Sequence, residues 1–211
     1  MITIYYSMIP NYVNPIEAVV NYTGLRSRCV MVGTNPYTNA AELAKSNPLS
    51  TVPAGIGDKG EALYGGPVLY EYLDQQHDKP KLFPVGPRLI FTRRQLWLAE
   101  GLFDQYARII GEVNQPPEKR RLAFVERQWK KTLAALDQLE RDALGWTGAL
   151  DIAQIRAACS IRFVANNIPA HGTALGVFDT AYDWRATRPM LAVWYARASA
   201  DAIFTPIQAD R

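Results

Sequence analysis

The sequence predicts two domains: a small α/β domain over residues 1–77 and an all-helical domain over 88–211, joined by a linker over 78–87. Three observations support this division. Short segments of changing type fill the first part, three prolines fall within the linker, and long apolar stripes at helical spacing follow it. With 48% hydrophobic and 20% charged residues, the chain has the composition of a globular protein.

The first domain is expected to follow the order β-α-β-α-β-β-α. Strands are expected at 2–6, 28–32, 52–56 and 61–64, where β-branched and aromatic residues gather. The run Asn14-Pro15-Ile16-Glu17 combines a helix cap, a proline at the first helical position and a capping-box acid, and Gly24 suits the end of that helix. Asn39 with Glu42 repeats the cap signal for a short helix.

The last two strands of this domain are separated by Gly57-Asp58-Lys59-Gly60, which is typical of a hairpin turn. Gly65-Gly66-Pro67 then opens another helix, because proline is favoured in a first helical turn. Beyond the linker, apolar stripes predict helices over 88–113, from Pro116-Pro117-Glu118 onward, from Asp151 onward and over 189–200.

Several classes of protein are disfavoured by the composition. The net charge of +3 is small and its basic residues alternate with acids, so nucleic-acid binding is not expected. No apolar stretch approaches membrane-spanning length and the N-terminus does not resemble a signal peptide, which predicts a cytoplasmic protein without a membrane partner. Cys29 and Cys159 are far apart, and free buried thiols are the simple interpretation. His77 and His171 lack neighbours at metal-ligand spacing, so no metal site is expected.

Several ordered motifs resemble those of glutathione transferases. The segment Asn47-Pro48-Leu49-Ser50-Thr51-Val52-Pro53-Ala54 is similar to their N-P-x-x-x-V-P-x run, and Leu63 to Leu73 is similar to their strand-then-helix segment ending in E-Y-L. In the helical part, Leu98-Ala99-Glu100-Gly101-Leu102-Phe103-Asp104 resembles the L-A-D-G-x-x-D of a bacterial subgroup. These likenesses follow one another in the family's order across nearly the whole chain.

The resemblance implies a thioredoxin-like N-terminal domain followed by the all-helical domain of the glutathione transferase fold. It implies glutathione as co-substrate, a homodimer, and a transferase of the detoxification type that directs the glutathione thiolate at a small electrophilic or apolar substrate. The alternative is a non-catalytic protein of the same fold that binds ligands or regulates a partner, because fold does not settle function.

The resemblance also implies which residues hold glutathione. A cis peptide before Pro53 would turn the main chain of Val52 toward the cysteinyl part of the ligand, as an added strand. The acid and serine that the family usually places at the next site are Gly65 and Gly66 here, so the main-chain amide of Gly66 and the helix end would remain for anion binding. Thr51 stands where lysine or glutamine is common. Glu100 aligns with an acid that in some classes reaches the neighbouring subunit's ligand, and a solvated helix charge is its alternative role.

The motifs leave more than one candidate for the residue that activates the thiol. Pro10 occupies the position of the family's serine or cysteine, and it has no donor. Pro10-Asn11 resembles half of the T-P-N motif of nu-class enzymes, so Asn11 is a candidate donor to the sulfur, with a turn or cap role as the alternative. Ser7 or Tyr6 are further candidates. The substrate pocket is expected to be lined by Tyr12, Trp97, Phe103, Tyr106 and Phe204, with plain core packing as the alternative for these aromatic residues.

Overall fold

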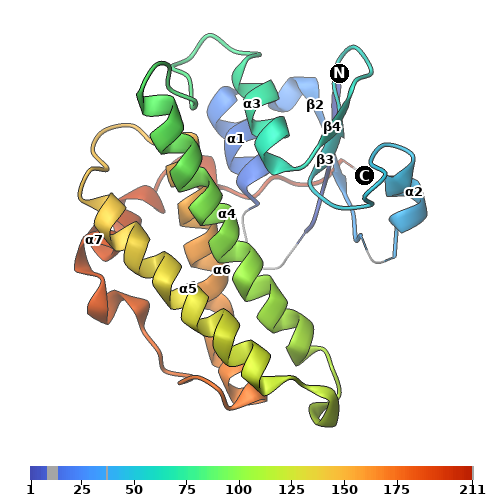
Figure 1. Cartoon of the computed structure of the whole chain (residues 1–211). Helices are drawn as coiled ribbons and strands as arrows, with labels where there is room; N and C mark the ends of the chain where they lie inside the picture. The colour runs from blue at the N-terminus through green and yellow to red at the C-terminus, as the bar shows by residue number, and fades with distance from the viewer. Residues whose placement is uncertain (9–13, 37, 211) are drawn as a thin grey trace. The chain divides into compact units, whose positions relative to one another are not determined.

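The computed structural model describes residues 1–8, 14–36 and 38–210, and the chain divides into two compact units (Figure 1). Unit 1 comprises Met1–Val85 together with the chain from Asp201 onward, and unit 2 is Gly86–Ala200. The sequence prediction placed everything after residue 87 in the helical domain. The structure differs, because the segment that contains Phe204 packs on unit 1, where Asn21 donates hydrogen bonds to the carbonyl groups of Ile203 and Thr205.

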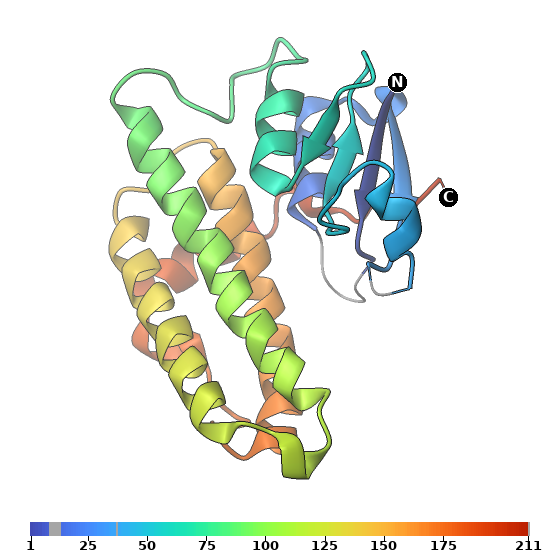
Figure 2. The same ribbon diagram turned by 45° about the vertical axis from the view of Figure 1, so that its right-hand side comes forward.

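A four-stranded sheet forms the centre of unit 1 (Figure 2). Its strands are β1 (Ile2–Tyr6), β2 (Cys29–Gly33), β3 (Ala54–Ile56) and β4 (Ala62–Tyr64), in the order β2-β1-β3-β4. β1 runs parallel to β2 and antiparallel to β3, and β3 runs antiparallel to β4. The C-terminal ends of β1 and β2 and the beginning of β3 therefore meet at one edge of the sheet.

Three helices accompany this sheet: α1 (Pro15–Thr23), α2 (Ala40–Ala44) and α3 (Gly66–Asp74). Helices α1 and α3 lie together on one face, and α2 lies on the other (Figures 1 and 2). The predicted capping box is confirmed, since the Asn14 side chain accepts from Ile16 N–H at 3.2 Å and Glu17 Oε2 accepts from Asn14 N–H at 2.8 Å. Gly24 ends α1 with φ of 75°, a left-handed conformation that suits glycine.

Some element boundaries differ from those predicted, for local reasons. A 3₁₀ turn at Arg26–Arg28 delays β2 to Cys29, and β3 begins only after Pro53, which has no N–H to donate to a sheet. Asn39 precedes α2, but its side chain makes no cap hydrogen bond. A second 3₁₀ turn at Pro117–Lys119 delays the next long helix to Leu122.

Unit 2 is helical and consists of α4 (Arg88–Val113), α5 (Leu122–Ala143), α6 (Ile152–Leu175) and α7 (Pro189–Ala198), with a 3₁₀ turn at Trp184–Thr187. Helix α4 packs against both α5 and α6, and α7 packs against α5. Residues Ile152 to Ile161 of α6 are buried all round the helix, which is typical of the central helix of a bundle. None of the helices within the described residues combines the length and apolar character that crossing a bilayer requires.

Candidate functional site

The turn before β3 presents an unusual stretch of main chain. The Val52–Pro53 peptide is cis, as predicted, and Pro53 O accepts the Gly65 N–H at 3.2 Å. No hydrogen bond joins the N–H or C=O of Val52 to another described residue. This half-buried residue lies two positions before β3, and its main-chain N–H and C=O are available to pair with an additional extended segment.

The shape of this turn depends on a buried asparagine whose role the sequence analysis missed. Asn47 Nδ2 donates to Thr51 O at 2.9 Å and to Thr51 Oγ1 at 3.2 Å, and Asn47 Oδ1 accepts the Leu49 N–H at 3.0 Å. The Ser50 N–H donates a hydrogen bond to Asn47 O at 2.8 Å. Thr51 is exposed beside Val52, and its hydroxyl takes part in this internal network. The sequence feature that could have indicated this role of Asn47 is that asparagine side chains commonly stabilise such turns.

The first turn of α3 follows β4, and the Gly65 N–H bond to Pro53 O joins it to the cis-proline turn. Its first intrahelical hydrogen bond joins the Leu69 N–H to Gly65 O at 3.2 Å, so the N–H groups of Gly66 and Val68 precede the helical ladder. Pro67 between them has no N–H. This helix end therefore offers two main-chain donors and the positive end of the helix dipole, which is a suitable environment for a carboxylate.

Tyr70 is a further residue at this helix end that the sequence analysis did not assign to the site. A Cβ at position 66 would lie 2.5 Å from Tyr70 Oη and 2.8 Å from Tyr70 Cζ. The phenol, which is 2% exposed, thus occupies the place where a serine side chain would begin. The i, i+4 spacing of Gly66 and Tyr70 on one helix was the signal that could have indicated the contact.

Ser7 follows β1 at the same edge of the sheet. It lines a cavity of about 510 Å³ together with Met8 from the same segment and with Thr34, Pro36 and Asn39 from the connection after β2. The Thr34 N–H donates to Tyr6 O at 2.8 Å and holds this connection against the end of β1. The predicted residues Asn11 and Tyr12 lie outside the described residues.

Glu100 is neither a solvated charge nor free of partners. Its Oε2 forms an ion pair with Arg156 Nη2 at 2.7 Å, and the Arg156 side chain is 5% exposed while that of Glu100 is 18% exposed. Arg156 also stacks on Phe103, with 4.7 Å between the guanidinium carbon and the ring centroid. The second oxygen, Glu100 Oε1, is buried and has no hydrogen-bond partner among the described residues. The solvated-charge alternative is therefore wrong, and a ligand role for Glu100 stays a prediction.

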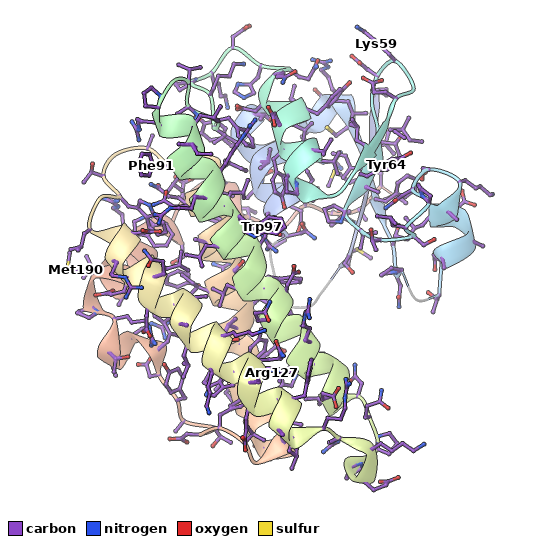
Figure 3. All side chains as sticks on the ribbon, in the orientation of Figure 1. Lys59, Tyr64, Phe91, Trp97, Arg127 and Met190 are labelled. Atoms are coloured by element: carbon purple, nitrogen blue, oxygen red, sulfur yellow. The ribbon has the colours of Figure 1, made fainter. Side chains whose placement is uncertain are left out.

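The aromatic residues expected to line one pocket are found in different places. Trp97 is 76% exposed on α4 and lines a groove of about 370 Å³ with Leu98, Gly101 and residues of α5 (Figure 3). Tyr106 is fully buried in the core of unit 2, and Phe103 packs on Phe163 at 4.5 Å between ring centroids. Phe204 is buried within unit 1. Within each unit, packing is the role that the contacts of Tyr106 and Phe204 indicate.

His77 is not isolated, because a carboxylate approaches it from the preceding helix. Its Nε2 lies 3.0 Å from Asp74 Oδ1, and its Nδ1 accepts the Lys79 N–H at 3.0 Å. Asp74 also accepts the main-chain N–H groups of Leu82 and Phe83 at 2.8 and 3.0 Å. This group holds the chain after α3 in place. In the described ranges, no three His, Cys, Asp or Glu side chains are gathered as a metal site.

The two cysteines, Cys29 and Cys159, are buried and are not joined in a disulfide. Burial raises the pKa of the Cys29 thiol to about 11, although Arg26 and Arg28 lower it in part. A thiol with such a pKa is almost entirely protonated near neutral pH and is therefore a poor nucleophile. Cys29 lies on β2 and Cys159 on α6, as packing residues.

Comparison with known proteins finds solved structures that are similar to nearly the whole chain. No protein-family model matches the chain. A glutathione transferase family member from Pseudomonas fluorescens Pf-5, solved with bound glutathione, superposes with a TM-score of 0.83 at 26% identity, covering 99% of this chain and all of that one. A glutathione S-transferase from Methylobacillus flagellatus KT, also solved with glutathione, gives a TM-score of 0.80 at 24% identity, covering 98% of this chain and 100% of that chain, which establishes the fold.

A curated relative adds a likeness in sequence. The uncharacterised GST-like protein YibF of Escherichia coli K12 is 27% identical over 133 residues, which are 61% of this chain and 66% of that protein, slightly less than two thirds of its length. These likenesses agree with the structural features described above, namely the cis-proline turn, the start of α3 and the helical unit 2. The chain has the fold of the glutathione transferases, and these likenesses in structure and sequence support a place in the glutathione transferase superfamily.

Proposed function

We propose that unit 1 binds glutathione and that the protein uses the bound thiolate on a small electrophilic or apolar substrate. One observation carries the proposal: the main chain of Val52, which no described residue pairs, lies beside the cis Pro53, whose carbonyl is hydrogen bonded to the start of α3. An extended peptide can pair with such a main chain while its carboxylate reaches a helix end. The family relative from Pseudomonas fluorescens, which was solved with glutathione, supports this choice of ligand.

In this proposal, the cysteinyl part of glutathione pairs with the N–H and C=O of Val52. The γ-glutamyl carboxylate accepts from the N–H groups of Gly66 and Val68 at the start of α3. The Tyr70 phenol lies where a serine side chain would begin, so it fills the space that the family's serine would take at position 66. No acidic side chain replaces the family's acid at position 65, so we expect weaker binding of the ligand's amino group.

The chemistry requires a thiolate at the end of β1. Ser7 and Asn11 are the candidates that would donate a hydrogen bond to the sulfur and so lower its pKa. The thiol proton passes to solvent, the sulfur forms a thioether bond with the electrophilic carbon, and the leaving group departs with its bonding electrons. Protonated Cys29 takes no part in this step.

Calorimetry with glutathione tests the binding half of the proposal. The matched ligand is the analogue whose γ-glutamyl α-carboxylate is an amide, which keeps the size of glutathione but removes the charge at the α3 end. We expect the analogue to bind at least about tenfold more weakly, because a charge-assisted hydrogen bond contributes roughly 1.5–3 kcal/mol. No heat of binding with millimolar glutathione, or equal affinity for the two ligands, would contradict the proposed site.

Turnover of a generic aromatic electrophile tests the catalytic half. Ser7→Ala and Asn11→Ala are compared with Cys29→Ala, which replaces a buried thiol that lies outside the proposed chemistry. We expect at least one of the first two variants to lose most of its kcat while Cys29→Ala retains it. Tight binding without turnover in the wild-type chain would instead establish the alternative, a non-catalytic ligand-binding protein.

A further inference from the structure

The turn before β3 is organised around the side chain of Asn47, which is fully buried. Its Oδ1 accepts the Leu49 N–H at 3.0 Å, and its Nδ2 donates to Thr51 O at 2.9 Å. One amide therefore contacts both the residue before Ser50 and the residue after it. The contact with Thr51 bears on the proposed ligand site, because Thr51 O and the Val52 N–H belong to one peptide unit.

The geometry of this peptide unit gives the Val52 N–H a defined direction. A peptide bond is planar, and in the trans form its C=O and N–H point in opposite directions. The peptide that joins Thr51 to Val52 is trans. Because Asn47 Nδ2 holds the Thr51 carbonyl, this carbonyl points toward a buried side chain and the Val52 N–H points away from it. The hydrogen bond from Asn47 thus orients a donor that no described residue pairs.

The backbone of Ser50 supplies an independent observation at the centre of this turn. Its φ is 50°, in the left-handed region that residues other than glycine rarely adopt. Such a conformation persists only where the surrounding structure imposes it, and it is common at ligand clamps. The Ser50 N–H donates to Asn47 O at 2.8 Å, and Ser50 Oγ donates to Ala40 O at 3.2 Å. These contacts and the Asn47 amide therefore impose the shape of the turn against the local preference of the chain.

We propose that Asn47 is a positioning residue of the glutathione site, which directs the Val52 N–H at the cysteinyl carbonyl of the ligand. The inference rests on the proposed function, because it concerns how that ligand pairs with Val52. A strand-like pair exchanges two hydrogen bonds, one from the Val52 N–H and one to the Val52 C=O, so rotation of the peptide plane weakens both. Asn47 itself makes no contact with the ligand in this proposal. Loss of its Nδ2 donor therefore lowers the affinity for glutathione through the Val52 pair.

Two substitutions remove this donor and keep an acceptor for the Leu49 N–H. Asn47→Asp has the size of asparagine but places a carboxylate oxygen against Thr51 O, and the two acceptors repel each other. Asn47→Ser keeps a shorter acceptor, because serine hydroxyls form the same kind of turn more weakly, and it serves if the aspartate variant does not fold. Asn21→Asp is the matched control, because Asn21 Nδ2 also donates to two main-chain carbonyls elsewhere in unit 1, at 2.9 and 2.8 Å.

The first measurement is the residual dipolar coupling of the Val52 N–H bond in the ligand-free chain. This coupling reports the direction of the bond and needs no glutathione. We expect it to change in both Asn47 variants, while the couplings of the sheet residues stay as in the wild type. In Asn21→Asp the Val52 coupling should also stay as in the wild type.

The second measurement is calorimetry with glutathione and with the analogue in which an ester replaces the γ-glutamyl–cysteinyl amide, which removes one N–H from the pair with Val52. We expect the ester to bind about three- to tenfold more weakly than glutathione to the wild type and to Asn21→Asp. The difference should fall below about twofold in the Asn47 variants, because the pair is already weakened there. The α-carboxamide analogue is the reference ligand, since its loss of affinity arises at the start of α3 and should be the same in every variant.

The outcomes separate this inference from the proposed function. A wild-type chain that binds no glutathione contradicts the proposed function, while the Val52 coupling still decides whether Asn47 sets the direction of the N–H bond. A wild-type chain that binds glutathione, together with Asn47 variants that keep the full loss of affinity for the ester, overturns the positioning role and leaves the function intact. An unchanged Val52 coupling in a folded Asn47 variant also overturns the inference. An equal effect in Asn21→Asp would attribute the change to general destabilisation and would overturn it as well.

Discussion

The contact between Gly66 and Tyr70 predicts that Gly66→Ala changes the stability of the protein in opposite directions, depending on whether Tyr70 is present. A methyl group at position 66 would lie 2.5 Å from Tyr70 Oη and 2.8 Å from Tyr70 Cζ, so one of the two side chains must move. Overpacking of this kind costs about 1–3 kcal/mol. For a chain of 211 residues, we therefore expect Gly66→Ala to lower the Tm by about 2–12 °C.

The same substitution is expected to behave differently once the phenol is gone. In a Tyr70→Leu background the obstructing atoms are absent, and alanine at the start of α3 restricts the unfolded chain more than glycine does. Gly66→Ala should then be neutral or stabilise by up to about 1 kcal/mol. Tyr70→Phe is not a sufficient relief, because the ring carbon Cζ remains in place. The double-mutant cycle should give a coupling free energy of about 1–3 kcal/mol.

Gly65→Ala provides the matched control at the neighbouring position. No heavy atom lies within 4 Å of a Cβ there, but φ is +82° and ψ is 161°, a region almost confined to glycine. Its cost of about 1–3 kcal/mol comes from the backbone and should be the same with Tyr70 or with Tyr70→Leu. Chemical denaturation of the four variants of each cycle measures these terms. Equal effects of Gly66→Ala in both backgrounds would refute the steric argument.

This argument also reverses a simple expectation about the ligand site. Replacing Gly65 and Gly66 by the acid and serine that the family usually carries would be expected to strengthen glutathione binding. In this structure the first change places a side chain in a strained backbone and the second meets Tyr70. Glycine at position 66 is therefore compatible with tyrosine at position 70, whereas serine is not. A variant that carries Gly66→Ser should also replace Tyr70 by a smaller residue.

Four further predictions follow from other parts of the molecule. Burial lowers the pKa of His171, so the unfolded chain binds a proton at this residue more readily than the folded chain. The free energy of unfolding should therefore fall as the pH drops below the ordinary histidine pKa of about 6.5. The urea midpoint of unfolding should lose this pH dependence in His171→Gln. Asp151→Ala removes the acceptor for Gln154 N–H at 3.0 Å and should cost about 1–2 kcal/mol by thermal unfolding; an unchanged Tm would exclude this cap as a stabilising element. Cys29 should resist alkylation at pH 8 in the folded chain and react in urea, because burial raises the pKa of its thiol to about 11. Sedimentation at micromolar concentration should give about twice the chain mass of 23.6 kDa, and a monomer would remove the predicted homodimer.

Much of the fold was accessible from local signals because those signals act through neighbouring residues. The capping box of Asn14 and Glu17, the left-handed Gly24 and the 88–113 helix depend on side chains within a few residues of one another. The family motif around Pro53 likewise predicted the cis peptide. Where prediction missed a boundary, as at β3, a single local property decided it: Pro53 has no N–H to donate to the sheet.

The candidate site was predictable only in its main-chain part. Residues 52–53 and 65–66 form contiguous motifs, so their position in the sequence was enough to indicate them. The phenol of Tyr70 against Gly66 depends on a side-chain conformation, and the ion pair of Glu100 with Arg156 joins residues 56 positions apart on two helices. Spacing in a single sequence does not specify such contacts, since many arrangements of the helices satisfy the same apolar stripes.

The C-terminal segment, residues 201–210, gives the clearest division between what the sequence and the three-dimensional structure each determine. Composition and periodicity alone establish an α/β part, a helical part and the cap of α1, because these depend on local propensity and on which side chains avoid water. That Ile207 contacts both Tyr6 and Glu17 follows only once the chain has folded. The reason is physical: the two hydrogen bonds span 201 and 190 residues, and the partly buried environment that strengthens them exists only in the packed unit.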